Sequence, residues 1–535
     1  MSSASSARGS SGRAEQASPS GASGSIRREL SRRDLLRRGG ALGAAAVVVS
    51  GFGRAAPRAS LARSTSLRPG QGAPPAHPVG RFVTEPGLVP PEIQATELST
   101  PVQAGYVMLT PSLLPSGRML TNAQSVAAGK GQMGTLITDL RGRPLWFKPS
   151  NQLTTNLQVQ SYRGQPVLTY WEGKIVNGIG YGTGYLLDAH YQQVATVKAG
   201  NGLQTDLHEL TLTPQNTALI TAYRLVPTDT TALGGSKRGS VYEGVVQEID
   251  IATGKLLFEW RSLDHVPVSE SYVKAAKGAI DYFHINSIGI WDDRHLLVSA
   301  RSTWTVYLID RRTGAVVWRL NGKKSDFAMG PGSHFYWQHH VRRYGADAVT
   351  IFDDGATPAE EAESRGLVLR LDLAARRASV AQQFIHPTDL LTFYEGSMQM
   401  LAGGHAFVGW GTEPYASEFD AKGNLVLDLR LPTGDQSYRA FRYLWTGLPK
   451  TSPLVAVEPD GIGGYAVYVS WNGATEVASW QVLSGSTPAA LAPLIKVARS
   501  GFETAITVHP KGHYLAVAGL DAQGRRLGVT RTVKL

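Results

Sequence analysis

Residues 307–318 read YLIDRRTGAVVW, and the expected fold follows from this stretch. An apolar run ends at Asp310, a turn with a glycine follows, and a second apolar run ends in an aromatic residue. The carboxylate of Asp310 can accept hydrogen bonds from the backbone of its own turn, and Gly314 can supply a positive φ angle. The stretch therefore predicts a β-hairpin.

The same hairpin unit occurs six times along the chain. In each copy an aspartate ends the first apolar run, and these residues are Asp139, Asp188, Asp250, Asp310, Asp372 and Asp420. Successive aspartates are 49, 62, 60, 62 and 48 residues apart. Repeats of this length with several short strands are typical of a β-propeller, whose ring of blades leaves only short strand edges. We therefore predict an all-β chain with a six-bladed β-propeller over residues 105–448.

The pattern changes after Pro449. Residues 453–535 contain about seven strand-like runs, among them YAVYVSW at 465–471 and YLAVA at 514–518. This number of strands fits an immunoglobulin-like or fibronectin-III-like β-sandwich over residues 449–535, with Trp480 as its core tryptophan. The alternative is a seventh blade, which would make the whole a seven-bladed propeller.

The N-terminal region has the features of an export signal. Residues 31–38 read SRRDLLRR, and the following fifteen residues are weakly apolar. Paired arginines before a short apolar stretch are typical of a twin-arginine signal, and the stretch is too short for a stable membrane span. We assign residues 1–62 to this signal with a basic extension, and residues 63–104 to a Pro/Gly-rich linker and lead-in. The sequence thus predicts an exported, extracytoplasmic protein (secreted or associated with the cell envelope) whose partners include the twin-arginine translocation machinery.

Composition excludes several classes of site. The chain has 535 residues and no cysteine, so it has no thiol nucleophile, no disulfide and no cysteine-ligated metal. The net charge is +11, but the first 70 residues hold twelve arginines and three acidic residues, which leaves +2 for the remainder. The basic charge therefore belongs to the N-terminal region, and nucleic acid is not a predicted partner.

Three histidines stand at the start of successive units: His208, His284 and His339. The first strand of a propeller blade lines the central channel, so we expect these imidazoles to meet there. Arg301 follows one strand later, and Asn286 lies two residues after His284, which predicts a shared face in a strand. Three imidazoles suggest a metal, but a guanidinium is a poor neighbour for a cation. We therefore predict an oxyanion site without a metal.

Several segments resemble the PAPS-independent arylsulfotransferase (aryl sulfate sulfotransferase) family, in its arylsulfotransferase-like branch. They are DLHE at 206–209, FHINS at 283–287, SARS at 299–302, QH at 338–339, IFDDG at 351–355, SRG at 364–366, GSMQ at 396–399 and SYRAFR at 437–442. The resemblance implies a six-bladed propeller and ping-pong transfer of a sulfuryl group through a sulfonated histidine. The nucleophile carries over onto His339, because it follows a glutamine, with His340 as the second choice. The anion-site residues carry over onto His208, His284, Asn286 and Arg301.

This chemistry is consistent with the residue types. Sulfuryl transfer resembles phosphoryl transfer, in which catalysis is mainly positioning and charge stabilisation. We expect neutral His339 to attack sulfur, Arg301 and Asn286 to bind the sulfuryl oxygens, and His208 or His284 to exchange a proton with the phenols. The predicted small-molecule partners are an aryl sulfate and a phenol. No cofactor is expected, because the donor is itself an aryl sulfate.

Two other functions fit the same pattern. One is a propeller used as a binding or adhesion module, with a central funnel that binds an anion without turnover. The other is a propeller dehydrogenase or metal-dependent lyase. The first predicts binding without a sulfonated intermediate, and the second predicts a bound quinone or metal.

Overall fold

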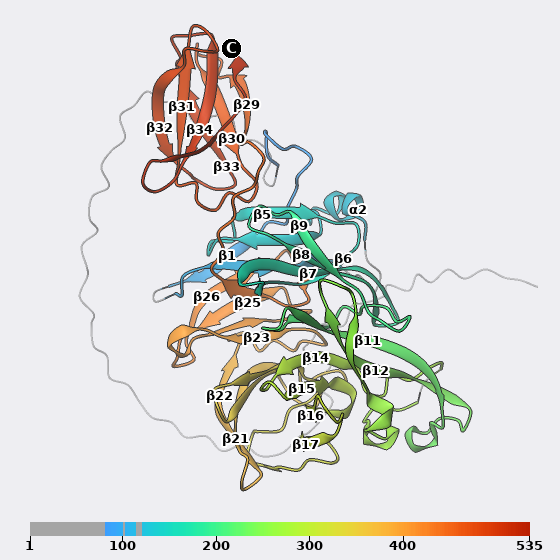
Figure 1. Cartoon of the computed structure of the whole chain (residues 1–535). Helices are drawn as coiled ribbons and strands as arrows, with labels where there is room; N and C mark the ends of the chain where they lie inside the picture. The colour runs from blue at the N-terminus through green and yellow to red at the C-terminus, as the bar shows by residue number, and fades with distance from the viewer. Residues whose placement is uncertain (1–80, 100–101, 114–119, 276) are drawn as a thin grey trace, which may run out of the picture. The chain divides into compact units, whose positions relative to one another are not determined.

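The computed structural model describes residues 81–99, 102–113, 120–275 and 277–535, and these form an all-β protein (Figure 1). The predicted export signal, and much of the predicted linker, lie outside these residues. In the described part the α-helical structure is one short helix, α2 (Asn122–Ala127), which begins with a capping box between Thr121 and Gln124. In the same part, no helix is long and apolar enough to cross a membrane.

Between Gln94 and Tyr443 the described strands form six sheets of four or five strands and a two-stranded ribbon. The first sheet contains β28 (Phe441–Tyr443), β2 (Tyr106–Leu109), β4 (Gly134–Thr138) and β5 (Pro144–Pro149). The second contains β6 (Leu153–Tyr162), β7 (Gln165–Val176), β8 (Ile179–Leu187) and β9 (Gln193–Val197). The third contains β10 (Leu210–Leu212), β11 (Thr217–Thr228), β12 (Gly239–Asp250) and β13 (Leu256–Arg261). The fourth contains β14 (Ile285–Ile290), β15 (His295–Ala300), β16 (Thr305–Asp310) and β17 (Val316–Leu320).

The remaining two sheets have five strands each. The fifth is β19 (His339–Tyr344), β20 (Ala348–Asp353), β21 (Arg365–Asp372) and β22 (Arg377–Ile385), with β18 (Ala328–Met329) parallel to β22. The sixth is β23 (Ser397–Met400), β24 (Ala406–Gly409), β25 (Tyr415–Phe419) and β26 (Leu425–Arg430), with β1 (Gln94–Leu98) on its outer edge. The ribbon pairs β3 (Pro111–Ser112) with β27 (Gln436–Ser437).

The six sheets contact one another in a closed circuit. β6 contacts β10, β11 contacts β14, β14 contacts β19, β19 contacts β23, β23 contacts β28, and β28 contacts β6. The first sheet joins chain segments more than 300 residues apart, since Tyr106 on β2 pairs with Tyr443 on β28. The circuit therefore brings the first strands of successive sheets close together, although these strands are far apart in the sequence.

The turns form as the sequence predicts. Asp310 Oδ1 accepts hydrogen bonds from the backbone N–H groups of Arg312 and Thr313, at 2.8 and 3.0 Å. Gly314 has φ 75° and donates its own N–H to the Asp310 carbonyl. The other five aspartates bind backbone N–H groups of their turns in the same way. The local prediction of a side-chain-capped hairpin is therefore confirmed.

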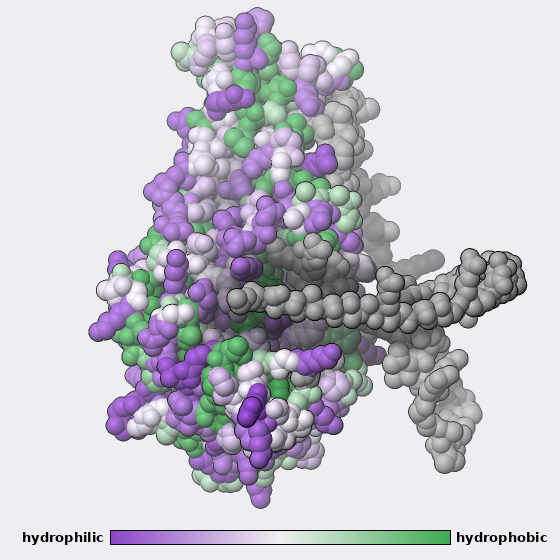
Figure 2. Space-filling view, turned by 90° about the vertical axis from the view of Figure 1, so that its right-hand side faces the viewer, coloured by the Kyte–Doolittle hydropathy of each residue, from purple (hydrophilic) through white to green (hydrophobic). Residues whose placement is uncertain are grey.

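Residues after Pro449 form two further sheets. One contains β29 (Leu454–Pro459), β30 (Tyr465–Ser470) and β33 (Glu503–Val508), and the other contains β31 (Ser479–Gly485), β32 (Ala492–Ala498), β34 (Tyr514–Leu520), β35 (Arg526–Val529) and β36 (Val533–Lys534). Val467, Trp480 and Val517, from three of these strands, belong to one buried cluster. Trp480 is 1% exposed, which confirms its prediction as a core residue. Figure 2 shows hydrophilic and hydrophobic residues intermixed on one face of the molecule.

A buried ion cluster connects the inner strands. The carboxylate of Glu209, just before β10, accepts hydrogen bonds from Arg342 at 2.8 Å and from Arg439 at 3.2 Å. Arg439 also donates to the backbone carbonyls of His208 and Asn286. Although burial raises it, the charges of Arg342 and Arg439 lower the pKa of Glu209 to about 2. The ion cluster of Glu209 with Arg342 and Arg439 therefore makes its full contribution to the free energy of unfolding above about pH 4.5. This contribution is lost as the pH falls toward 2 and Glu209 becomes protonated in the folded protein.

We expect Arg439→Ala to lower the free energy of unfolding by about 3 kcal/mol, because breaking a buried ion pair leaves charge and carbonyl groups without their partner. Urea unfolding measured at pH 7 checks this. Arg294→Ala is the control, since Arg294 pairs with Asp310 but its side chain is 56% exposed, and a much smaller loss is expected. Equal loss in the two variants would contradict the role given to Arg439.

Candidate active site

Four of the predicted site residues meet in one cavity. It has a volume of about 610 Å³, and His208, His284, His339 and Arg301 line it. The ring centroids of His208 and His284 are 4.8 Å apart, and those of His284 and His339 are 6.3 Å apart. The remaining lining residues are Ile175, Asn177, Gly178, Leu207, Phe393, Tyr394, Glu395, Thr412, Gln436 and Tyr438. The cavity thus brings together residues that lie in or next to strands of the third, fourth and fifth sheets.

Each histidine stands where a sheet begins. His208 comes just before β10, His284 directly before β14, and His339 is the first residue of β19. His284 has φ 48°, a left-handed conformation that is uncommon outside glycine and that concentrates at functional sites. The histidines therefore lie at the ends of the strands rather than along them.

A carboxylate holds each imidazole through Nδ1. The Nδ1 atoms lie 2.5 Å from Asp206 Oδ2 for His208, 2.5 Å from Asp281 Oδ2 for His284, and 2.8 Å from Asp354 Oδ2 for His339. A carboxylate on Nδ1 sets the tautomer and leaves Nε2 with its lone pair. These contacts between aspartates and histidines were not predicted from the sequence, although Asp206 and Asp281 precede their histidines by two and three residues. Asp354 follows β20 and reaches His339 only through the sheet.

The imidazole of His339 is suited to act as a nucleophile. Its Nε2 accepts a long hydrogen bond of 3.4 Å from the backbone N–H of Glu395, so the ring proton is assigned to Nδ1. Burial, followed by the charge of Arg301, lowers the pKa of His339 well below its usual value. Burial also lowers the pKa of His284, although Asp281 opposes this shift. Both rings are therefore neutral near pH 7.

Arg301 supplies a fixed positive charge to the cavity. It stands in the short turn that follows β15, and its Nη2 donates to the carbonyls of Ala356 and Phe393 at 3.2 and 3.0 Å. The guanidinium lies over the ring of Trp337, with Cζ 4.9 Å from the ring centroid. Its Nε is buried and has no hydrogen-bond partner among the described residues. A cation held in this way, with an unused donor, is suited to bind an oxyanion.

Asn286 does not line this cavity. It is fully buried on β14, and its Nδ2 donates to the backbone carbonyl of Gln338 at 2.6 Å. The prediction that it shares a face with His284 assumed strand geometry at both positions. His284 lies outside β14 and has a left-handed backbone, so the alternation of side chains does not extend to it.

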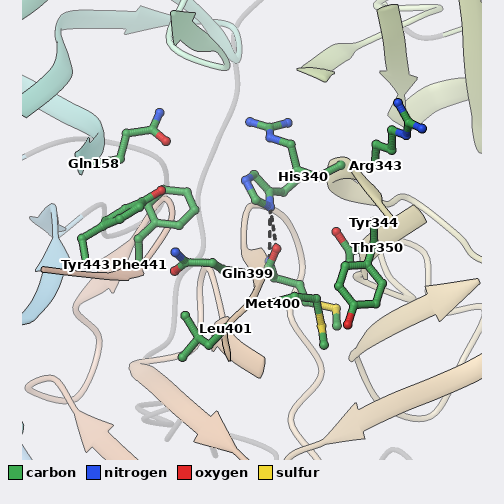
Figure 3. A pocket seen from close by; sticks show the side chains of 12 residues that line it. Gln158, His340, Arg343, Tyr344, Thr350, Gln399, Met400, Leu401, Phe441 and Tyr443 are labelled. Atoms are coloured by element: carbon green, nitrogen blue, oxygen red, sulfur yellow. Dashed lines mark hydrogen bonds between the residues drawn. The ribbon is translucent and has the colours of Figure 1, made fainter. Parts of the chain in front are cut away.

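His340 faces a different cavity, of about 330 Å³, which Figure 3 shows. Gln399 and Tyr443 also line it, and His340 Nδ1 lies 3.1 Å from the carbonyl oxygen of Met398. The two adjacent histidines thus line different cavities. Arg301 and the other two site histidines line only the cavity of His339.

Five further lining residues carry chemistry that the sequence analysis did not assign. Phe393 and Tyr394 are aromatic residues that line the cavity and are 44% and 52% exposed. The hydroxyl of Tyr438 is buried and has no hydrogen-bond partner among the described residues. Glu395 and Gln436 bind each other. Within the described residues, no three carboxylate or imidazole side chains are grouped in a way that would hold a metal ion.

Comparison with known proteins identifies a family. The family model for arylsulfotransferase (ASST) matches residues 158–431, which is more than half of the chain. This range contains His208, His284, Arg301, His339 and Glu395. A search of curated proteins finds no match.

Solved structures give only weak similarity. A protein of unknown function from Bacteroides caccae is 11% identical, covers 63% of this chain and 98% of its own, and has a TM-score of 0.38. The β-propeller domain of Cps50 (Swd1) from Myceliophteria thermophila is 11% identical, covers 60% and 97%, and has a TM-score of 0.30. Virginiamycin B lyase from Staphylococcus aureus is 10% identical, covers 70% and 96%, and has a TM-score of 0.28. The match to the family model is a separate finding, and its range, 158–431, contains most of the residues that line the cavity. The chain therefore belongs to the arylsulfotransferase (ASST) family.

Proposed function

We propose that this protein transfers a sulfuryl group from an aryl sulfate to a phenol by a ping-pong mechanism, with a sulfonated His339 as the intermediate. One observation carries the proposal: His339 keeps Nδ1 on Asp354 and presents Nε2 to a cavity that also contains a buried guanidinium. The exposed rings of Phe393 and Tyr394 suit an aryl group at the same cavity.

In the first half of the reaction, Nε2 of His339 attacks sulfur, and the bond between sulfur and the aryl oxygen breaks. The imidazole ring becomes positively charged, and Asp354 on Nδ1 stabilises this charge. Arg301 binds the sulfuryl oxygens, whose charge is spread in a loose transition state. In the second half, an acceptor phenol attacks the sulfur, and the N–S bond breaks.

His208 and His284 are assigned to the phenol side of the reaction. Both line the cavity and lie close to each other, and each has its Nδ1 on an aspartate. An imidazole whose Nε2 has a free lone pair can accept a hydrogen bond from the hydroxyl group of an acceptor phenol and orient it. Asn286 has its side-chain amide on a backbone carbonyl, so we propose that it holds β14 against the fifth sheet rather than binding sulfate.

We also propose that residues 105–448 form a six-bladed propeller and residues 449–535 an immunoglobulin-like or fibronectin-III-like sandwich. The closed circuit of six sheets and the pairing of β2 with β28 support the first assignment. The buried cluster shared by the two C-terminal sheets supports the second over a seventh blade, since a blade would pack into the ring. Export through the twin-arginine pathway is proposed from the sequence of residues 31–53 alone.

The test is to incubate the purified protein with 4-nitrophenyl sulfate and a phenol, and to measure nitrophenol release against both substrate concentrations. We expect double-reciprocal plots with parallel lines, and, without acceptor, a protein whose peptide containing His339 is heavier by one SO₃ group. Incubation with 4-nitrophenyl phosphate is the control for non-specific hydrolysis. Tight binding of the sulfate with no release and no modified peptide would favour the binding module instead.

A further inference from the structure

We propose that Glu395 is the catalytic acid and base of this reaction: it gives its proton to the departing phenolate and takes a proton from the acceptor phenol. The inference rests on the proposed sulfuryl transfer and adds a residue that neither the sequence motifs nor the family match assigns. It follows from the position of Glu395, from its hydrogen-bond partners and from the contacts between the three histidines and their aspartates.

Glu395 lies beside the reacting nitrogen. Its backbone N–H is 3.4 Å from Nε2 of His339, and its side chain lines the same cavity. The backbone of Glu395 has φ 77°, a left-handed conformation that costs energy in a residue other than glycine. The following Gly396 and the nearby Gly411 leave no room for side chains, with Gly411 packed against the backbone of residues 394–396. This strained segment therefore holds Glu395 at the cavity.

The carboxyl group of Glu395 is not paired with a cation. Its hydrogen-bond donor among the described residues is Gln436 Nε2, at 3.0 and 3.1 Å from the two oxygens. A neutral amide compensates a carboxylate charge only weakly, and burial raises the pKa of Glu395 to about 8. The group is therefore mostly protonated at pH 7, and one of its oxygens has a proton to give.

His284 and His339 lack such a proton. The Nδ1 atoms of His208, His284 and His339 are all occupied by aspartates. Burial lowers the pKa of His284 and of His339, and in these neutral rings the N–H lies on Nδ1, toward the aspartate, and Nε2 is an acceptor. The departing phenolate needs a donor at the moment when the S–O bond breaks, and Glu395 is the carboxyl group that faces the cavity without a histidine or arginine bound to it.

The proton and electron balance is complete without another reactant. In the first half, the lone pair of His339 Nε2 forms the N–S bond, the aryl oxygen leaves with the S–O electron pair, and it takes the proton of Glu395. The products are a phenol, sulfonated His339 and an ionised Glu395. In the second half, Glu395 takes the hydroxyl proton of the acceptor, the phenol oxygen bonds to sulfur, and His339 leaves with the N–S pair. Both residues return to their starting forms.

The experiment compares Glu395→Gln with the wild type on aryl sulfates whose phenols differ in acidity. Protonation of the leaving group matters most for a weakly acidic phenol, so we expect kcat/KM to fall by roughly 10²–10⁴-fold with phenyl sulfate and far less with 4-nitrophenyl sulfate. Asp389→Asn is the matched control, since it removes an exposed carboxylate from the same loop, and we expect it to leave both rates unchanged.

A pH profile gives a second readout. Because the acid form is needed, kcat/KM for the donor should fall as the pH rises through about 8, and this limb should be absent in Glu395→Gln. The other titratable or charged groups that face Glu395 across the cavity or behind it are His208, His284, Arg301, His339, Asp354, Tyr394 and Tyr438. The substitution leaves all of these side chains in place, but it also removes a charge that raises the pKa of Asp354. The limb is therefore assigned to Glu395 if it is lost, and not if it only moves to lower pH.

The possible failures are distinct. If Glu395→Gln slows all donors equally and keeps the alkaline limb, Glu395 has only a structural role and the inference is overturned. In that case sulfonation of wild-type His339 would still be detected by mass spectrometry. If the wild-type protein is never sulfonated, the proposed function fails, and the role of Glu395 fails with it.

Discussion

His339→Ala is expected to lower kcat/KM for sulfuryl transfer by on the order of 10⁴-fold or more, because the covalent route is lost and not merely slowed. The cavity, Arg301 and the two other histidines stay in place in this variant. Binding of an aryl sulfate should therefore change little. The measurements are nitrophenol release and the mass of the intact protein after incubation with donor alone.

His340→Ala is the matched control for that loss. The two residues are adjacent and both buried, but His340 lines the smaller cavity with Gln399 and Tyr443. The His340→Ala variant should therefore still form the sulfonated intermediate on His339 and keep most of the wild-type rate. If the His339→Ala protein still becomes sulfonated, or the His340→Ala protein does not, then His340 rather than His339 is the nucleophile.

Asp354→Asn is expected to lower kcat by about 10²–10⁴-fold while KM changes only a few-fold, since Asp354 does not line the cavity. Asp354 Oδ2 holds the Nδ1 proton of His339 at 2.8 Å, and Asp354 is fully buried. An asparagine amide at this position can donate to Nδ1, which would move the ring proton to Nε2 and remove the attacking lone pair.

Asp206→Asn provides the comparison for Asp354, because Asp206 makes the same contact with His208 Nδ1. His208 does not become sulfonated in the proposed mechanism, so Asp206→Asn should still yield the modified His339 peptide. Steady-state kinetics and quantification of that peptide after rapid quenching separate the two variants. Equal loss of the modified peptide in both would indicate that the aspartates only support the fold.

The sequence was informative where the determining interactions are local. The six turns depend on an aspartate and the backbone within a few residues of it, and Asp310 and its counterparts cap their turns as predicted. The repeat of these turns also led to the grouping of His208, His284 and His339, because equivalent positions in successive units meet when the sheets close into a circuit.

Two kinds of error followed from the same local reasoning. Asn286 was assigned by strand alternation and by the family resemblance, but the left-handed backbone at His284 breaks the alternation one residue before β14 begins. Glu395 and Gln436 were not assigned at all. Glu395 lies in the loop before β23 and Gln436 on β27, 41 residues apart, and no spacing in the chain relates either residue to His339.

The amino-acid order alone therefore determined the hairpins, the all-β class and the set of imidazoles that stand at the beginnings of strands. These depend on short-range hydrogen bonds and on a repeat that can be counted. The tertiary structure decided which carboxylate holds each ring, which of two adjacent histidines shares a cavity with Arg301, and which acid has its backbone N–H beside Nε2 of His339. Those outcomes depend on backbone direction at single residues and on burial, and both are set only when distant strands pack together.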